Sequence, residues 1–179
     1  MSIQRYEIAA RVQSGKLHLL RPEARGAATK RVLLLTGTMK TAVVGGPWVD
    51  NIEENRLAGT LRADLERFVS GDILRVSLGG RELATEDMKL LQDTYEVWEF
   101  KSKAKKGIRV FGRFAGYDVF VATNWQWRCK LGAYGSNQWA AEINKCRTEW
   151  ANMFQILTPH TGDSIHAYLS DAEDASLFY

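Results

Sequence analysis

The sequence is poor in three residue types that often reveal the class of a protein. Among its 179 residues there are two cysteines, three prolines and three histidines. Two cysteines do not make a disulfide framework, so we expect free thiols in a reducing cytoplasm. So few prolines, with 15 glycines, exclude collagen-like and low-complexity chains. The scattered histidines have no metal-ligand spacing, so neither a metal nor another cofactor is expected.

Long hydrophobic runs are also missing. No segment approaches the roughly 20 apolar residues that a membrane-spanning helix needs. The opening stretch, MSIQRYEIAARVQSGK, is charged and has no apolar core of the kind a secretory signal contains. Phosphate-loop, dinucleotide-binding and zinc-protease motifs are absent from the sequence. The expectation is therefore a soluble globular domain without a membrane partner.

The net charge of +3 hides segments of opposite sign. Residues 1–32 carry seven basic and two acidic side chains, and residues 99–130 carry eight basic and two acidic ones. Residues 156–179 carry four acidic side chains and no lysine or arginine. The basic segments favour a polyanionic partner. The acidic tail has two interpretations: it is solvated, or it folds over the basic segment and masks it.

The beginning of the chain has the pattern of short strands. Strands are predicted at 3–12 and 17–20, joined by a turn, and a third at 32–35. Gly45-Gly46-Pro47 is the clearest break in the chain. This break separates a β-rich N-terminal extension (1–48) from a main domain (49–157). Thr158-Pro159 ends the main domain, and an acidic C-terminal tail (158–179) follows.

Helical periodicity marks two segments of the main domain, 52–70 and 136–155. Apolar residues recur there every three or four positions, which places them on one face of a helix. Asp50 and Ser136 are the expected N-caps.

The part between these helices is predicted to be mostly strands. Strands are expected at 95–101, 108–114 and 117–124, the last two as an antiparallel hairpin, after a short turn at 85–90. The predicted fold is α+β, with an antiparallel sheet packed against helices.

Basic and aromatic side chains are concentrated between residues 95 and 130. Alternation places Arg109 and Arg113 on one face of a strand. Tryptophans such as Trp127 are interleaved with the basic residues. Cations together with aromatic planes suit a phosphodiester backbone and unstacked bases. The pattern leaves open a plainer alternative, a solvated charged face with core aromatics on the opposite side.

Residues 89–101, KLLQDTYEVWEFK, resemble a motif of the RelE/ParE toxin superfamily. In that motif a leucine precedes a short turn and then a strand of the type Leu-Trp-Glu-Leu-Arg. The order of helix, three strands and helix extends the resemblance over about residues 52–155, and includes the phage-derived RelE-like branch. The resemblance implies a RelE-like fold.

The resemblance also implies an activity. Active members are toxins that cleave mRNA in the ribosomal A site, so the implied partners are mRNA on the ribosome and an antitoxin protein. Carried over by position, Arg109 matches the strand arginine that contacts phosphate, Lys101 the basic end of the motif, and either Arg128 or Lys130 the base after the last strand. The candidate catalytic residues of an endoribonuclease are Lys101, Arg109 and Arg128. Further side chains expected to contact nucleic acid are Lys103, Lys105, Lys106, Arg113, Lys130 and Trp127.

Two departures from the family support an alternative function. The family's C-terminal catalytic tyrosine or histidine has no clear counterpart, and Tyr168 and Tyr179 are the remaining candidates. The compact toxins also have no counterpart of residues 1–48. Because one fold hosts several functions, the alternative is a non-catalytic, phage-type inhibitor or binding protein. It would use the same scaffold against a host protein, nucleoprotein or defence complex.

Overall fold

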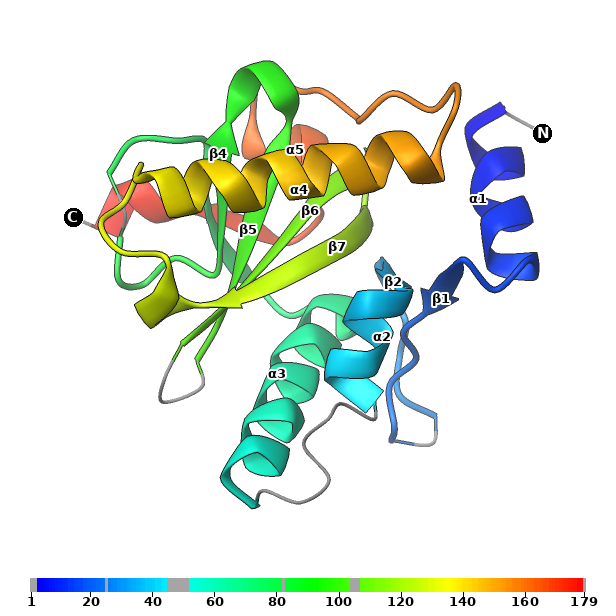
Figure 1. Cartoon of the computed structure of the whole chain (residues 1–179), viewed down its shortest axis with the longest axis horizontal. Helices are drawn as coiled ribbons and strands as arrows, with labels where there is room; N and C mark the ends of the chain where they lie inside the picture. Colours follow the sequence, from blue (N-terminus) through cyan, green and yellow to red (C-terminus); the bar gives the residue numbers. More distant parts are fainter. Residues whose placement is uncertain (1–2, 25, 45–51, 82, 104–106, 179) are drawn as a thin grey trace.

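A computed structural model of the chain describes residues 3–24, 26–44, 52–81, 83–103 and 107–178. The fold is α+β and is built on one eight-stranded sheet, with the strand order β1-β2-β7-β6-β5-β4-β3-β8 (Figure 1). None of the helices in the described ranges combines the length and apolar character that crossing a membrane requires.

The elements follow one another in a mixed order. The strands are β1 (Leu17–Leu19), β2 (Val32–Thr36), β3 (Leu74–Ser77), β4 (Met88–Gln92), β5 (Val97–Ser102), β6 (Ile108–Gly116), β7 (Val119–Trp127) and β8 (Ala172–Asp174). The helices are α1 (Ile3–Gln13), α2 (Gly37–Val44), α3 (Ile52–Ser70), α4 (Asn137–Met153) and α5 (Ile165–Tyr168), with 3₁₀ turns at Asp93–Tyr95, Arg128–Lys130 and Ala175–Phe178.

The centre of the sheet is the antiparallel meander β4–β5–β6–β7. Its last three strands correspond to the predicted strands, and β6 and β7 form the predicted hairpin. The flanking strands differ, because β2 pairs with β7 in parallel and β3 pairs in parallel with both β4 and β8. The α+β class is thus confirmed, but the sheet is mixed rather than antiparallel throughout.

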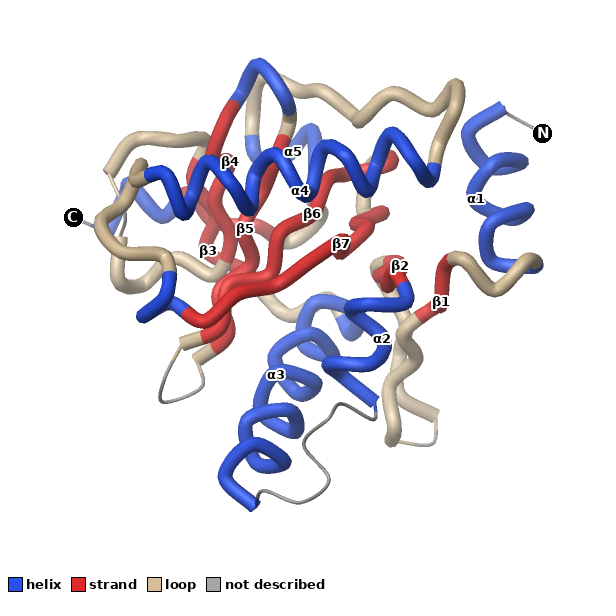
Figure 2. Tube along the Cα trace, in the orientation of Figure 1, coloured by secondary structure: helices blue, strands red, loops and turns tan. Residues whose placement is uncertain are grey.

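Helices cover both faces of this sheet (Figure 2). Val97 and Phe111 pack with Trp139 of α4 on one face. Their neighbours Trp98 and Val110 point the opposite way, into the larger core that α2 and α3 share. This alternation is the consequence of the pleat, which sends successive side chains to opposite faces. The predicted helices at 52–70 and 136–155 are confirmed as α3 and α4.

The predicted strand at 3–12 is wrong, because this segment is the helix α1. Helical spacing puts Glu7 and Arg11 on one face, one turn apart. There the Glu7 carboxylate accepts a hydrogen bond from the Leu157 N–H (2.7 Å), and Arg11 Nε donates to the Met153 carbonyl (2.6 Å). Both partners lie at or just after the C-terminal end of α4. Contacts with a distant part of the chain therefore hold α1 in place.

Other local predictions have different outcomes. The short strands at 17–20 and 32–35 are confirmed as β1 and β2. The turn predicted at 85–90 is wrong, because Met88 and Leu90 are buried core residues of β4 that pair with Phe100 and Trp98 of β5. Gly45-Gly46-Pro47 and Asp50, on which the domain boundary and the first N-cap were predicted, lie outside the described residues.

The C-terminal tail contributes to the core. Tyr168 and Leu169 are fully buried in the cluster that contains α3. Strand β8 pairs with β3 and so extends the sheet at its edge. The solvated interpretation of the tail is therefore wrong for this part of it.

Candidate nucleic-acid interface

Three strands end together at one side of the sheet. Ser102, Ile108 and Trp127 are aligned in one row across β5, β6 and β7. Because adjacent strands lie about 4.8 Å apart, this row is about 10 Å long. We call this end of the sheet the open end, since it lies opposite the tight β6–β7 turn. Lys103, which follows β5, and the segment 128–130, which follows β7, bring the predicted residues Lys103, Arg128 and Lys130 to this end.

The row next to the open end is charged. Lys101, Arg109 and Gln126 are partners across the same three strands, and cross-strand partners share a face. Arg109 Nε lies 3.2 Å from Glu99 Oε2, and Lys101 Nζ lies 3.7 Å from Glu99 Oε1. The sheet thus brings two of the three candidate catalytic residues together, on either side of a fully buried carboxylate.

Lys101 is held inside the protein. Its ammonium pairs with Glu86 and donates to the Leu83 carbonyl at 3.0 Å, and its side chain is only 8% exposed. Glu86 is itself buried, and it accepts further hydrogen bonds from the Ser77 hydroxyl (2.5 Å) and the Leu83 N–H (3.1 Å). Such partners are what a buried charge requires. Lys101 therefore stabilises the segment between β3 and β4.

Gly107 lies close to both Arg109 and the third candidate catalytic residue, Arg128. A Cβ at this position would lie 3.1 Å from Arg128 Cβ and 3.4 Å from Arg109 Nη1. The Gly107 carbonyl also accepts a hydrogen bond from the Arg128 N–H (2.9 Å). Its φ of +62° is in the left-handed region that glycine tolerates best. Glycine here lets both arginines approach the chain closely.

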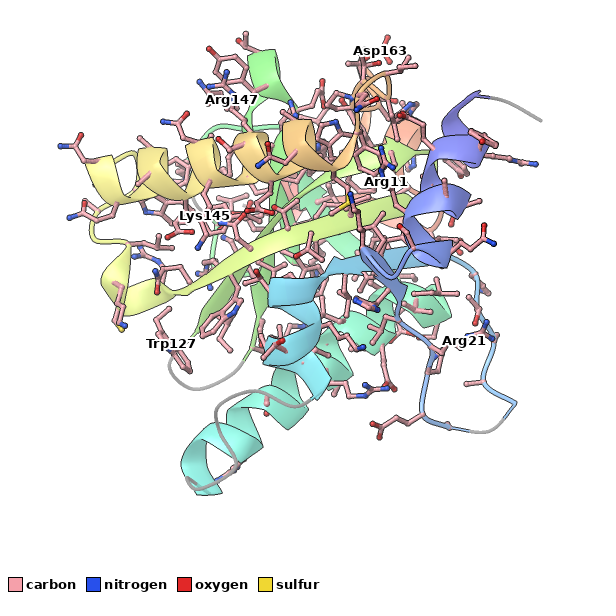
Figure 3. The ribbon with its side chains drawn as sticks, turned by 45° about the vertical axis from the view of Figure 1, so that its right-hand side comes forward. Arg11, Arg21, Trp127, Lys145, Arg147 and Asp163 are labelled. Atoms are coloured by element: carbon pink, nitrogen blue, oxygen red, sulfur yellow. The ribbon has the colours of Figure 1, made fainter. Side chains whose placement is uncertain are left out.

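Arg128 has a fixed orientation at the surface. Its Nη1 donates to the Gly132 carbonyl at 2.7 Å, and its guanidinium lies over the Trp139 ring, 5.7 Å from the centroid. Lys130, two residues on, is exposed. Trp127 is half-buried and contacts Trp125 edge-on, with 5.5 Å between ring centroids. In Figure 3, Trp127 lies at the end of the sheet away from α1.

Lys103 lies on the other side of the same end. Its backbone N–H donates to Asp64 Oδ2 of α3 (2.8 Å), and its ammonium lies 3.2 Å from Asp87 Oδ1. The side chain is 62% exposed. Lys105 and Lys106, which follow it, lie outside the described residues.

Arg113 is turned into the protein. It shares the α4 face with Arg109, as predicted, but its Nε donates to the Tyr95 carbonyl (2.9 Å) and its guanidinium lies over the Trp150 ring. Burial lowers its pKa. Arg113 thus connects the turn before β5 to α4, away from the open end.

Tyr168 is also buried. Its hydroxyl donates to Glu96 Oε2 (2.7 Å) and accepts from the Gly162 N–H (2.8 Å) within the core. Burial, followed by the hydrogen bond with Glu96, raises its pKa. Tyr179 lies outside the described residues.

Several carboxylates near the site escaped the sequence analysis. Glu142 of α4 accepts hydrogen bonds from Asn124 Nδ2 (2.7 Å) and Gln126 Nε2 (3.3 Å). Like Glu86, it gives no local signal, because its partners are on other elements. Within the described ranges, the histidines, cysteines and carboxylates form no group of three that could hold a metal ion.

The open end thus combines fixed cations with an aromatic plane. Comparison of the chain with protein-family models, curated proteins and solved structures gives no match.

Proposed function

We propose that this protein is a cytoplasmic, RelE-like RNA-binding protein that contacts mRNA on the ribosome through its open end. The observation that carries the proposal is the convergence there of Lys103, Trp127, Arg128 and Lys130 from the ends of two strands. Cations neutralise backbone phosphates, and a tryptophan face stacks on an unpaired base. The succession β5, β6, β7 and α4 supports the proposal, because the RelE resemblance implies three strands followed by a helix; β3 and β4 stand between α3 and these strands.

In the first form of the proposal the protein cleaves the mRNA. Attack of a ribose 2′-hydroxyl on the neighbouring phosphate forms a 2′,3′-cyclic phosphate; the hydroxyl proton is lost to water, and the bond to the 5′-oxygen of the next nucleotide breaks, that oxygen taking a proton from water. Negative charge builds up on the phosphate oxygens in this step. Arg128 and Arg109, whose side chains both lie close to Gly107, would stabilise this charge. Lys101 would act indirectly, because its ammonium is paired with Glu86.

In the second form the protein binds without cutting and inhibits a host nucleoprotein complex. The specific observation in its favour is that both Lys101 and Arg109 are paired with the buried Glu99. A carboxylate between them neutralises part of the positive charge that would attract a scissile phosphate.

The first experiment measures RNA binding by fluorescence anisotropy with a short labelled single-stranded RNA. Trp127→Ala should weaken binding by about 5- to 150-fold, the loss of 1–3 kcal/mol from one stacked base. Arg128→Ala should lower the slope of log affinity against log salt by about 0.7. Lys40→Ala, an exposed charge on α2, is the matched control and should change neither. A wild-type protein that does not bind RNA, or an equal loss in the control, would contradict the proposal.

The second experiment separates the two forms. Purified protein is added to translating ribosomes, and the mRNA is examined for A-site cuts by primer extension. Cuts that Arg128→Ala removes would identify an endoribonuclease. RNA binding without cuts, together with stable capture of ribosomes or another host nucleoprotein, would identify the inhibitor.

A further inference from the structure

A cleft of about 370 Å³ opens beside Lys103. Its lining consists of three basic side chains from three different parts of the chain, one aliphatic side chain, one hydroxyl and two carboxylates. These residues are Arg67, Arg75, Lys103, Ile73, Thr85, Asp87 and Glu173.

Asp87 organises the basic side chains of the cleft. Its Oδ1 lies 3.2 Å from Lys103 Nζ and 3.8 Å from Arg67 Nη1, and its Oδ2 accepts a hydrogen bond from the Arg75 N–H (3.0 Å). The Asp87 side chain is only 6% exposed, whereas that of Lys103 is 62% exposed. The carboxylate is therefore turned inward, and it fixes two cations at the mouth of the cleft.

Arg67 and Lys103 have further N–H donors with which they can bind an anion. Lysine carries three N–H donors and arginine five, arranged in a planar fork. Arg67 uses its Nε toward Asp72, 3.2 Å away, and its side chain remains 35% exposed. Glu173 lines the opposite side of the cleft, where it pairs in register with Arg75. An anion would therefore enter on the side of Arg67 and Lys103.

The cleft continues the open end. Lys103 follows Ser102, which is in the same row as Ile108 and Trp127. This row is about 10 Å long, so one strand of RNA can contact Trp127 and Lys103 together. Ile73, 58% exposed, adds an apolar surface to the cleft. The volume is within the range of small-ligand sites.

We propose that this cleft binds a nucleotide phosphate, through Arg67 and Lys103, and that the nucleotide belongs to the RNA strand that passes the open end. The second part rests on the proposed function. A free nucleotide has the same phosphate chemistry, so the test has one arm for each source.

The RNA arm compares two double variants with the same change in charge. Arg67→Ala with Lys103→Ala removes two phosphate contacts, which counterion release converts into about a 25-fold loss of affinity at about 0.1 M salt and a slope lowered by about 1.4. Arg56→Ala with Lys40→Ala removes two exposed charges outside the cleft. It should leave the RNA affinity and the salt slope close to those of wild type. Lys103→Ala alone guards against a folding defect, because its side chain is exposed and its backbone contact with Asp64 is kept.

The nucleotide arm titrates the protein with AMP and follows the backbone amide signals of Ile73, Thr85 and Lys103 by NMR. Loss of RNA affinity confined to the cleft variants, without AMP shifts, supports an RNA phosphate site. AMP shifts that the double variant abolishes support a site for free nucleotides. The inference is overturned if the cleft variants bind RNA as well as the control does and AMP causes no shifts. In that case Trp127→Ala still tests the proposed function independently. A wild-type protein that binds neither probe overturns both.

Discussion

Arg109 and Glu99 form an ion pair between β6 and β5, with Arg109 Nε 3.2 Å from a carboxylate oxygen of Glu99. The Glu99 side chain is fully buried, and its other oxygen faces the ammonium of Lys101 at 3.7 Å. The carboxylate therefore lies between two residues that the RelE resemblance makes catalytic. It orients Arg109, and it also opposes an incoming phosphate.

This arrangement predicts that Glu99→Gln lowers the stability of the protein. The change keeps the shape of the side chain but leaves two cations facing a neutral amide. Breaking a buried ion pair from one side costs about 3–5 kcal/mol. Urea denaturation followed by tryptophan fluorescence measures the free energy of unfolding.

A double-mutant cycle provides the control for this prediction. If the pair is coupled, Arg109→Gln combined with Glu99→Gln should cost less than the sum of the two single changes. Costs that simply add, or a Glu99→Gln variant within about 0.5 kcal/mol of wild type, would contradict the role given to Glu99.

Arg31 is predicted to be a second strong contributor to stability. Its side chain is fully buried and lies 3.5 Å from Asp118 Oδ1. It also donates to four backbone carbonyls, two at the end of α3 and two in the tail, those of Phe68, Asp72, Ser170 and Asp171. Burial lowers its pKa, and Asp118 partly offsets this effect.

Replacing Arg31 with methionine should therefore cost about 3–5 kcal/mol, because it removes the cation beside the Asp118 carboxylate and leaves several carbonyls without their donor. Chemical denaturation measures the loss. The matched control is Lys30→Met at the preceding position, where the side chain is 58% exposed and lies 3.9 Å from Asp171. An exposed ion pair contributes at most about 1 kcal/mol. Equal losses in the two variants would refute the role of Arg31.

Because of the buried Tyr168 hydroxyl, we expect the stability of the folded protein to fall at high pH. Burial raises its pKa above the ordinary value of 10.0, so the folded protein keeps a proton that the unfolded chain has already lost. Its contribution is therefore fully present below about pH 10 and declines above it, by up to about 1.4 kcal/mol per pH unit. Tyr168→Phe has no such proton. The stability advantage of wild type over this variant should shrink between about pH 9 and pH 11 in urea titrations, and a constant difference would contradict the prediction.

The parts of the fold that the sequence predicted are those with local signals. The periodicity of α3 and α4 and the alternation of β6 come from residues within the same element, so a single sequence reveals them. The same holds for the basic and aromatic composition of the open end.

The parts that could not be predicted depend on distant partners. The contacts of Arg11 and Glu7 in α1 are with residues 142 and 150 positions away. Lys101 pairs with Glu86, 15 positions earlier, and β4 lies between them in the chain. The sequence shows which residues are basic but not which of them are exposed, because pairing with a buried carboxylate depends on the tertiary fold.

The two cysteines provide a test of the packing of α4 against the sheet. Cys146 is buried, and burial raises the pKa of its thiol to about 11, whereas Cys129 is exposed beside Arg128. Because the thiolate is the reactive form, a disulfide reagent at neutral pH should label only Cys129 in the native protein. If the reagent releases a coloured thiol, its absorbance should correspond to one reacted cysteine per native chain. In denaturant it should correspond to two. Cys129→Ser should then show almost no native labelling, and rapid reaction of Cys146 in that variant would mean that α4 detaches from the sheet more readily than its packing indicates.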